Sequence, residues 1–412
     1  MKLAKLSLAT IMALGVSASA ADSLEGMFKE GKVSGEIRSM YINNDDSDDT
    51  TKNGSFAVGG NLKFETASFM GVSFGAGFYT TNDLGFNSAP NAQVGSLVSD
   101  ADKSYNLLGE AYIQYKLGNT VVKAGRQQLD TPFAGPDDVR IVPDLFEAYT
   151  LINTDIADTT LVLAHVTKMA GWDSLAANNN MTEFQSMSEA GGVAGLTGSQ
   201  DGVTVAAAVY SGLKDATLQA WYYTLAGDLD AIYLQADYSW NCLLANSIKM
   251  NGAVQYMDYS GDDKLSIIDH NVWGAKLDGN FGNSGFAFDL AYNKYSDDPM
   301  PGGAGPAAAW GGYPEFAYAE EVWVQSAGQD SDVFRIGGSY DFAKTGVEGL
   351  TAEVAYVDFS NMGANDIEVV DFILSYDVQS VANLSTRFVY EDRDIQAGDD
   401  TDILKLYVGY TF

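Results

Sequence analysis

The charged residues of this chain keep to one side of an alternating pattern, and that pattern is its most restrictive feature. In the segment 384–391 no charge occupies an even position, whereas Arg387 and Glu391 both occupy odd positions. Arg335 and Glu353 are likewise flanked on both sides by apolar residues. Because side chains of a β-strand alternate between two faces, each segment predicts a strand with one uncharged face. The same pattern recurs in 32–43, 55–66, 105–117, 232–238, 286–292 and 404–412.

A strand with one uncharged and one charged face suits a barrel in a lipid bilayer. A basic residue on the lipid side near mid-membrane costs about 2–4 kcal/mol, so the charges must point into a lumen. A soluble β-sandwich or β-helix also alternates, but it accounts less well for the aromatic strand ends and the long series of strands. Aromatic residues make up 12% of the chain and glycine is abundant, at 43 residues. We therefore predict an all-β fold, a transmembrane antiparallel up-and-down β-barrel.

Both ends of the chain fit export to the bacterial outer membrane. Residues 1–20 have the basic start, short apolar run and Ala18-Ser19-Ala20 cleavage site of a signal peptide, although a buried N-terminal helix is the alternative. The mature barrel domain would then be 21–412. The last strand ends at Phe412 and resembles the insertion signal of outer-membrane barrels. The barrel-assembly machinery is therefore an expected partner, along with outer-membrane lipid and lipopolysaccharide.

Short and long connections alternate along the chain, which predicts tight periplasmic turns and longer external loops. Counting hairpins gives about eighteen strands, with the segment 169–201 leaving the count uncertain by two. We expect a barrel of this size to enclose a water-filled lumen rather than a packed core.

The composition excludes several functions. The net charge is −32, which becomes −34 once Lys2 and Lys5 leave with the signal peptide, so binding of nucleic acid is not expected. Cys242 is the single cysteine, which excludes an intramolecular disulfide, and with only two histidines a histidine-based metal site is not expected. Beyond the signal peptide no apolar run reaches the eighteen residues of a membrane helix. We expect no cofactor and no metal.

Two competing functions rest on weaker features. Gly71-Val72-Ser73-Phe74-Gly75 matches the G-x-S-x-G nucleophile elbow of hydrolases, but it lies in an alternating segment rather than in a strand-turn-helix context. The acidic run 45–49 lacks the spacing of an EF-hand loop. It leaves open a structural or adhesive surface protein whose acidic loops are bridged to lipopolysaccharide by divalent cations.

The segment GRQQLDTPFAGPDDVRIVPD contains three of the eight prolines of the chain. Proline fixes φ and lowers the entropic cost of holding one shape. The connection 128–144 is therefore either a surface loop closed by its own turns or a constriction loop folded into the lumen. The candidate constriction residues are Arg126, Asp130, Asp137, Asp138, Arg140 and Asp144.

The stretches GRQQLDTPFAGPDD, FEAYTL, ADSLEGMFKEGKVSGEIR and KLYVGYTF resemble the OprD-type outer-membrane porins. The resemblance covers nearly the whole mature chain. It implies an eighteen-stranded barrel, monomeric or loosely trimeric, whose third external loop folds inward. It also implies a ladder of lumenal bases that guides carboxylate-bearing solutes. Lumen charges are assigned on this basis and by parity, that is, by whether a residue takes the odd or the even positions of its alternating segment. They are Arg38, Lys63, Glu110, Arg335, Glu353, Arg387, Arg393 and Lys405.

This sequence departs from that pattern because acids share the lumen positions with the bases. Glu36, Glu65, Asp289 and Glu391 also have lumen parity. Charges of both signs would create a transverse field that orients dipolar solutes such as amino acids. The sign of the selectivity stays open, and the function expected is passive diffusion of ions and small hydrophilic solutes.

Overall fold

The computed structural model describes most of the chain. The described ranges are 20–46, 52–87, 104–174, 182–190, 202–225, 227–243, 247–262, 265–266, 268–298, 310–321, 329–360, 366–396, 398 and 400–412. The expected signal peptide, apart from its last residue, lies outside these ranges, as does most of the acidic run 45–49.

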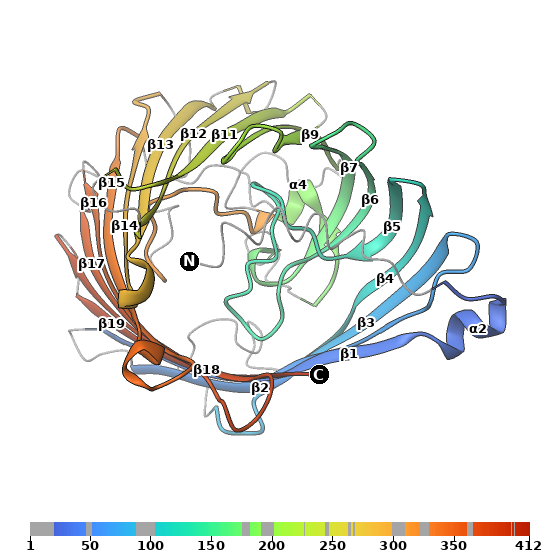
Figure 1. The fold of residues 1–412 in the computed structure, drawn as a ribbon, viewed down its shortest axis with the longest axis horizontal. Coiled ribbons are helices and arrows are strands. Elements are labelled where there is room, and N and C mark those ends of the chain that lie inside the picture. Colours follow the sequence, from blue (N-terminus) through green and yellow to red (C-terminus); the bar gives the residue numbers. More distant parts are fainter. Residues whose placement is uncertain are drawn as a thin grey trace.

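Antiparallel strands follow one another around a closed barrel (Figure 1). The barrel closes because β1 pairs with β19 as well as with β2. Of the nineteen strands in the sheet, the two-residue β8 pairs with β7 beside the β7–β9 ladder, so eighteen strands form the wall. The strands are β1 (Lys32–Asp46), β2 (Lys52–Glu65), β3 (Val72–Asn82), β4 (Tyr105–Leu117), β5 (Thr120–Gln127), β6 (Leu145–Asn153), β7 (Thr159–Ala170), β8 (Gln185–Ser186), β9 (Val203–Tyr210), β10 (Ala216–Leu225), β11 (Leu229–Asn241), β12 (Lys249–Gly261), β13 (Asp269–Asn280), β14 (Phe286–Tyr295), β15 (Asp332–Asp341), β16 (Leu350–Ser360), β17 (Ile367–Asp377), β18 (Leu384–Ile395) and β19 (Thr401–Thr411).

The helices are short. They are α2 (Leu24–Lys29), η1 (Trp172–Ser174), α4 (Met187–Ala190), η3 (Gly282–Ser284) and η6 (Phe342–Thr345). Helix α2 projects from the outside of the barrel (Figure 1), and its N-cap Ser23 accepts a hydrogen bond from the Gly26 amide at 2.9 Å. None of the described helices has the length and hydropathy needed to cross a membrane.

The predicted alternation of faces is confirmed on most strands. On β15, Phe334 and Ile336 are 40% and 47% exposed on the outer surface, whereas Arg335 between them is 4% exposed. A β-bulge reverses the faces at one end of β4. There Gly77 pairs with Glu110 but Phe78 pairs with Leu108, so Gly109 is an additional residue. The uninterrupted alternation predicted over 105–117, which would put Leu107 on the same uncharged face as Ile113, is therefore wrong at this end of the strand.

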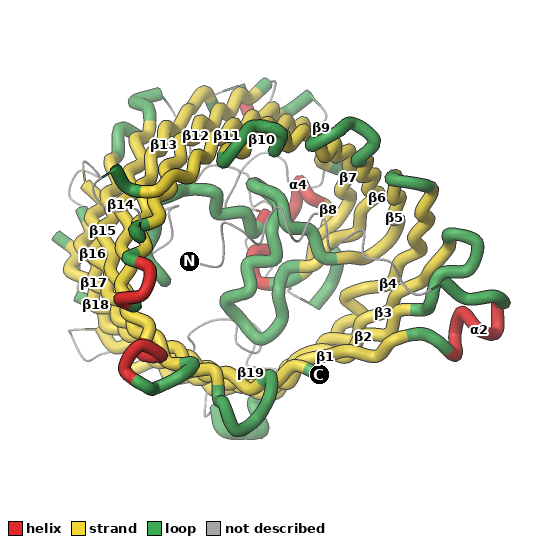
Figure 2. Tube along the Cα trace, in the orientation of Figure 1, coloured by secondary structure: helices red, strands yellow, loops and turns green. Residues whose placement is uncertain are grey.

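Part of the barrel interior is packed rather than water-filled. The inner faces of β6, β7 and β9 to β14 carry buried apolar residues that form one cluster with residues of the connections. Loops occupy the space inside the ring of strands in Figure 2. The prediction of a lumen without a packed core is wrong for this side, because no charge sets the inner face of strands such as β9 (sequence VTVAAAVY).

The connection between β5 and β6 spans 128–144, the bounds predicted from sequence, and it folds inward. Other bounds differ. The connection 226–228 between β10 and β11 is short although it lies on the external side, and β18 continues to Ile395, beyond the predicted segment 384–391. The uncertain segment 169–201 contains β8 and α4.

Candidate pore constriction

The β5–β6 loop is held against the apolar side of the lumen by Phe133. This residue is fully buried, and its ring centroid lies 4.9 Å from that of Tyr223 and 5.3 Å from that of Tyr259. The turn that contains Phe133 is closed by the Thr131 amide, which donates to the Ala134 carbonyl at 2.9 Å. Because buried aromatic side chains are the largest contributors to cores and interfaces, Phe133 is a main anchor of the loop.

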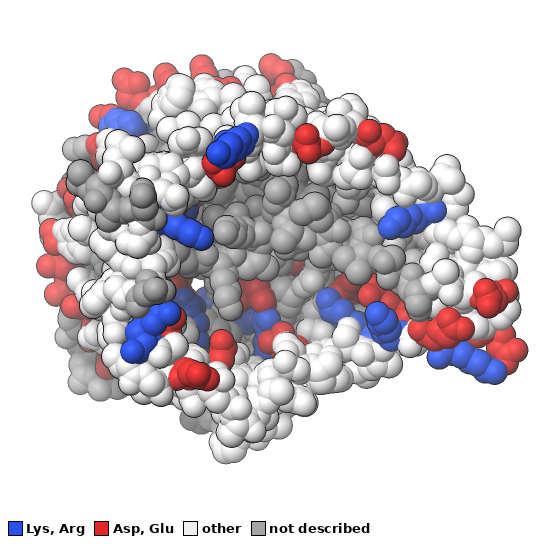
Figure 3. All heavy atoms as spheres, viewed as in Figure 1, with Lys and Arg blue, Asp and Glu red and all other residues white. Residues whose placement is uncertain are grey.

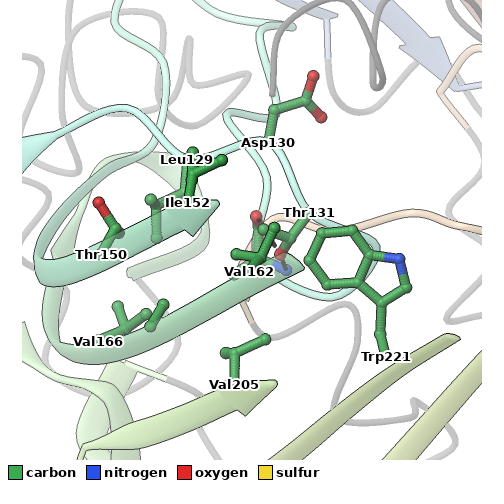
Figure 4. A pocket seen from close by; sticks show the side chains of 11 residues that line it. Leu129, Asp130, Thr131, Thr150, Ile152, Val162, Val166, Val205 and Trp221 are labelled. Atoms are coloured by element: carbon green, nitrogen blue, oxygen red, sulfur yellow. Dashed lines mark hydrogen bonds between the residues drawn. The ribbon is translucent and has the colours of Figure 1, made fainter. Parts of the chain in front are cut away.

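A small cavity of ≈ 20 Å³ lies behind the start of the loop, and Figure 4 shows its lining. Its walls are mainly apolar side chains of β6, β7, β9 and β10, including Ile152, Val162 and Trp221. The Asp130 carboxylate points away from it (Figure 4). The cavity is large enough for about one water molecule and is too small to be a solute site.

A second segment, 310–321 of the β14–β15 connection, also folds into the lumen. The Gly135 amide donates to the Trp310 carbonyl at 3.2 Å, and the Trp310 indole donates to the Met187 carbonyl at 3.1 Å. The Ala317 amide donates to Asn293 on β14 at 2.8 Å. The sequence interpretation missed this segment, although its run of Trp, Tyr, Pro and Phe is unusual for an exposed loop.

Arg335 is the centre of the charged side of the lumen. Its Nε lies 2.9 Å from Asp289, one terminal nitrogen lies 2.8 Å from Glu353, and the other lies 3.9 Å from Asp371. It also donates to the carbonyl of Tyr318 in the inward segment at 2.9 Å. A guanidinium with five donors can hold carboxylates of β14, β16 and β17 and the loop together.

Two acids of the inward segment pair with further bases on this side of the lumen. Glu320 lies 2.5 Å from Arg387, and Glu321 forms an ion pair with Lys405 and lies 3.7 Å from Arg140. Figure 3 shows basic and acidic side chains gathered together on the lower lumen wall in this view, over β1, β2 and β18. The ladder is therefore covered by a connection far away in the sequence.

The β5–β6 loop reaches the same wall through Arg38. This side chain forms a bidentate ion pair with Asp138, contacts Glu36 at 2.9 Å and donates to the Arg140 carbonyl at 3.1 Å. On β2, Lys63 lies 2.5 Å from Glu110. Arg393 lies 2.5 Å from Glu391 on β18.

The structure separates Arg126 from the other predicted constriction residues. It has the opposite parity to Lys123 and Gln127, which are buried on the lumen side of β5. Arg126 instead lies 3.9 Å from Glu147 and 4.3 Å from the centre of the Phe184 ring. Sequence reasoning missed Lys123, which parity within β5 could have identified. Asp137 and Asp144 are brought together with Asp173, which was not predicted.

The nucleophile-elbow geometry is not formed around Ser73. This residue is the second of β3 and pairs with Gln114 on β4. The motif requires a sharp turn into a helix, which β3 does not make.

Comparison with known proteins agrees with this architecture. Residues 25–412 match the family described as outer membrane porin, OprD family. No curated protein matches the chain. Among solved structures, Pseudomonas aeruginosa OccK8 (OprE) is 20% identical with a TM-score of 0.74, covering 94% of this chain and 99% of that one. P. aeruginosa OpdK, solved with vanillate, is 19% identical with a TM-score of 0.76, covering 94% and 100%.

Acinetobacter baumannii OccAB4 is 17% identical with a TM-score of 0.75, covering 93% of this chain and 98% of that one. At these identities the solved structures establish the barrel fold, and the family match extends over the whole barrel. The chain belongs to the OprD family of outer-membrane porins and is a passive diffusion channel of the bacterial outer membrane.

Proposed function

We propose that this porin favours small cationic and zwitterionic solutes over free anions, and that the β5–β6 loop and the segment 310–321 together form its constriction. The main observation in support of this selectivity is that every predicted base of the ladder already has a carboxylate within 4.0 Å. A solute carboxylate would have to compete with acids that are covalently part of the channel and therefore always present.

The acids in these lumenal ion pairs outnumber the bases, so the paired wall keeps a negative balance. Seven bases take part: Arg38, Lys63, Arg140, Arg335, Arg387, Arg393 and Lys405. Nine acids face them: Glu36, Glu110, Asp138, Asp289, Glu320, Glu321, Glu353, Asp371 and Glu391. A narrow lumen with low-dielectric walls amplifies such an excess and concentrates counter-ions of opposite sign.

The test is the reversal potential of the purified channel in a planar bilayer under a KCl gradient. We expect the wild type to pass K⁺ more readily than Cl⁻. Glu320→Gln removes a carboxylate from the partly exposed Arg387, and we expect the permeability ratio of K⁺ to Cl⁻ to fall about two- to threefold. Glu348→Gln is the matched control, because it removes the same charge from an exposed turn.

A wild-type reversal potential of the anion-selective sign would refute the proposal. An unchanged ratio in Glu320→Gln would show that Arg387 does not lie on the permeation path. Equal shifts in the Glu320 and Glu348 variants would mean that overall charge, not the constriction, sets the ratio.

A carboxylate substrate is the second candidate. One observation favours it: the related OpdK was solved with vanillate, which is a carboxylate. Competition with the ladder acids argues against this class here. Permeation of benzoate-sized anions faster than equally sized ammonium ions would support it over our first proposal.

We also propose that β19 carries the assembly signal. Leu406, Tyr410 and Phe412 are exposed on its outer face, and the Phe412 amide donates to the Gly35 carbonyl at the closure of the barrel. Removal of Phe412 is expected to lower the amount of protein reaching the outer membrane. The monomeric or trimeric state stays a prediction.

A further inference from the structure

Three carboxylates from two connections meet beside the constriction. Asp137 and Asp144 lie in the β5–β6 loop, and Asp173 lies in η1 directly after β7. One oxygen of each lies within 4.8 Å of the others. Asp144 is fully buried and Asp173 is 8% exposed. Carboxylates this close together and this well shielded from water repel one another strongly unless a positive charge lies between them.

Two of the oxygens in this cluster are buried without a hydrogen bond from the described residues. They are Oδ2 of Asp144 and Oδ2 of Asp173. The other oxygen of each is engaged, since the Asp173 amide donates to Asp144 Oδ1 at 3.3 Å and the Tyr313 hydroxyl donates to Asp173 Oδ1 at 2.9 Å. The engaged oxygens orient both carboxylates, and this orientation leaves the other two oxygens facing into the cluster. A buried polar atom of this kind needs a partner.

The backbone approaches these oxygens as closely as glycine allows. At Gly311, with φ of +74°, a Cβ would lie 2.4 Å from Asp144 Oδ2 and 3.2 Å from Asp173 Oδ2. At Gly171, with φ of +131°, a Cβ would lie 2.3 Å from Asp144 Oδ1. Any side chain at Gly311 would therefore occupy the space that the two unpartnered oxygens face. Gly311 belongs to the second inward segment, so three connections converge here.

The local charge balance leaves room for two positive charges. Arg140 and Lys405 both act on Asp137, and Arg140 also acts on Asp173, but the same two bases form ion pairs with Glu321. Four carboxylates thus share two bases.

We propose that Asp137, Asp144 and Asp173 bind a calcium ion that joins the β5–β6 loop to η1 beneath Gly311. All the side-chain ligands are carboxylate oxygens, which suit a hard cation and not zinc or copper. Oxygens up to 4.8 Å apart match calcium, whose ligands lie at about 2.3–2.6 Å in a flexible geometry, better than magnesium with its shorter distances of about 2.0–2.1 Å. The ion holds both inward segments at one point.

Terbium luminescence tests this site in the full-length, refolded protein. Terbium stands in for calcium, and Trp172 and Tyr313 lie next to the cluster to sensitise it. We expect saturable luminescence that calcium displaces. Asp144→Asn and Asp173→Asn are each expected to weaken the apparent affinity by about tenfold or more, because affinity depends on ligand charge. The control Asp262→Asn removes an exposed acid from the β12–β13 connection.

Gly311→Ala gives an independent test because it changes no charge. Its methyl group would stand 2.4 Å from Asp144 Oδ2, and we expect a loss of affinity similar to that of Asp144→Asn. The heat-dependent shift in electrophoretic mobility of the folded barrel shows whether each variant has folded. Asp137→Asn replaces any variant that fails to fold.

The proposal is overturned if the wild type shows no calcium-displaceable luminescence, or if both Asn variants bind as tightly as the wild type. It is also overturned if the wild type binds no calcium and Asp144→Asn instead raises stability at neutral pH. That result would mean that the carboxyls share protons. The proposal is independent of ion selectivity, so either can fail alone.

Discussion

The two sides of the lumen are built from opposite chemistry. On the inner faces of β9 to β12, Val205, Trp221, Tyr233 and Met257 are at most 3% exposed and belong to one apolar cluster. On the inner faces of β15 to β19 and β1, arginines and a lysine alternate with carboxylates. Both sides belong to one sheet with one alternation rule, so the difference lies in which residues occupy the inner positions of the strands.

The β5–β6 loop touches both sides with different residues. Phe133 packs on the aromatic rings of the apolar side, whereas Asp138 pairs with Arg38 on the charged side. Burial of an aromatic ring supplies non-directional docking free energy, and ion pairs fix orientation. In the function that we propose, the apolar side positions the β5–β6 loop and the charged side filters solutes.

Removing the anchor on the apolar side should have the largest effect. Phe133→Ala leaves a cavity among Tyr223, Tyr233 and Tyr259 and should weaken docking by about 3–5 kcal/mol. We expect higher single-channel conductance and more open-channel noise, because the loop leaves the lumen part of the time. Phe28→Ala, at an exposed position on α2, is the control. Unchanged conductance in Phe133→Ala would contradict the assignment of the loop as the constriction.

Removing the centre of the charged side should mainly lower stability. Arg335→Met leaves Asp289, Glu353 and Asp371 without their shared base, at a cost of about 3–5 kcal/mol. The thermal midpoint of the detergent-solubilised barrel should fall, and cation preference should increase. The control Lys29→Met breaks an exposed pair with Glu25, worth about 0–1 kcal/mol. Equal midpoints for the two variants would refute the role of Arg335.

Sequence predicted the barrel because the bilayer constrains each strand separately, whereas the inward fold of the loop 128–144 was predicted from the family resemblance, since its prolines and charges alone also fitted a surface loop. A charge on the lipid side is forbidden strand by strand, so parity alone placed Arg335 and Arg387 in the lumen. The rule fails at Leu107 because the bulge at Gly109 reverses the faces there. A bulge depends on how two strands pair, so the sequence of one strand does not predict it. Strand β9 carries no charge and gave no signal for its inner face, and the pattern over 232–238 on β11 gave the inner face without showing what packs against it, so the apolar side was not predicted.

Several partners of the ladder could not be predicted because they come from distant segments. Glu320 and Glu321 lie in a connection that looked like an ordinary external loop, and only folding brings them to Arg387 and Lys405. The Asp173 carboxylate likewise joins Asp137 and Asp144 only through the pairing of β6 and β7. Parity gives the face of a residue and not its neighbour across the lumen.

A smaller effect follows from an acid that lies against the apolar side. Glu315 acts electrostatically on Tyr233, Tyr259 and Tyr295, and burial raises its pKa to about 7. Its neutral form therefore favours docking of the segment 310–321. This contribution is fully present below the ordinary pKa of about 4.5 and is lost as pH rises through about 7.

Between about pH 5 and pH 8, ionisation of Glu315 should therefore increase open-channel noise and shift the reversal potential towards K⁺. Glu315→Gln should remove that part of the pH response, whereas Glu348→Gln should keep it, because Glu348 lies on an exposed turn. Recordings at both pH values under one KCl gradient measure the difference. An identical pH response in wild type and Glu315→Gln would show that the apolar side does not control the ionisation of this acid, and would restrict titratable selectivity to the charged side.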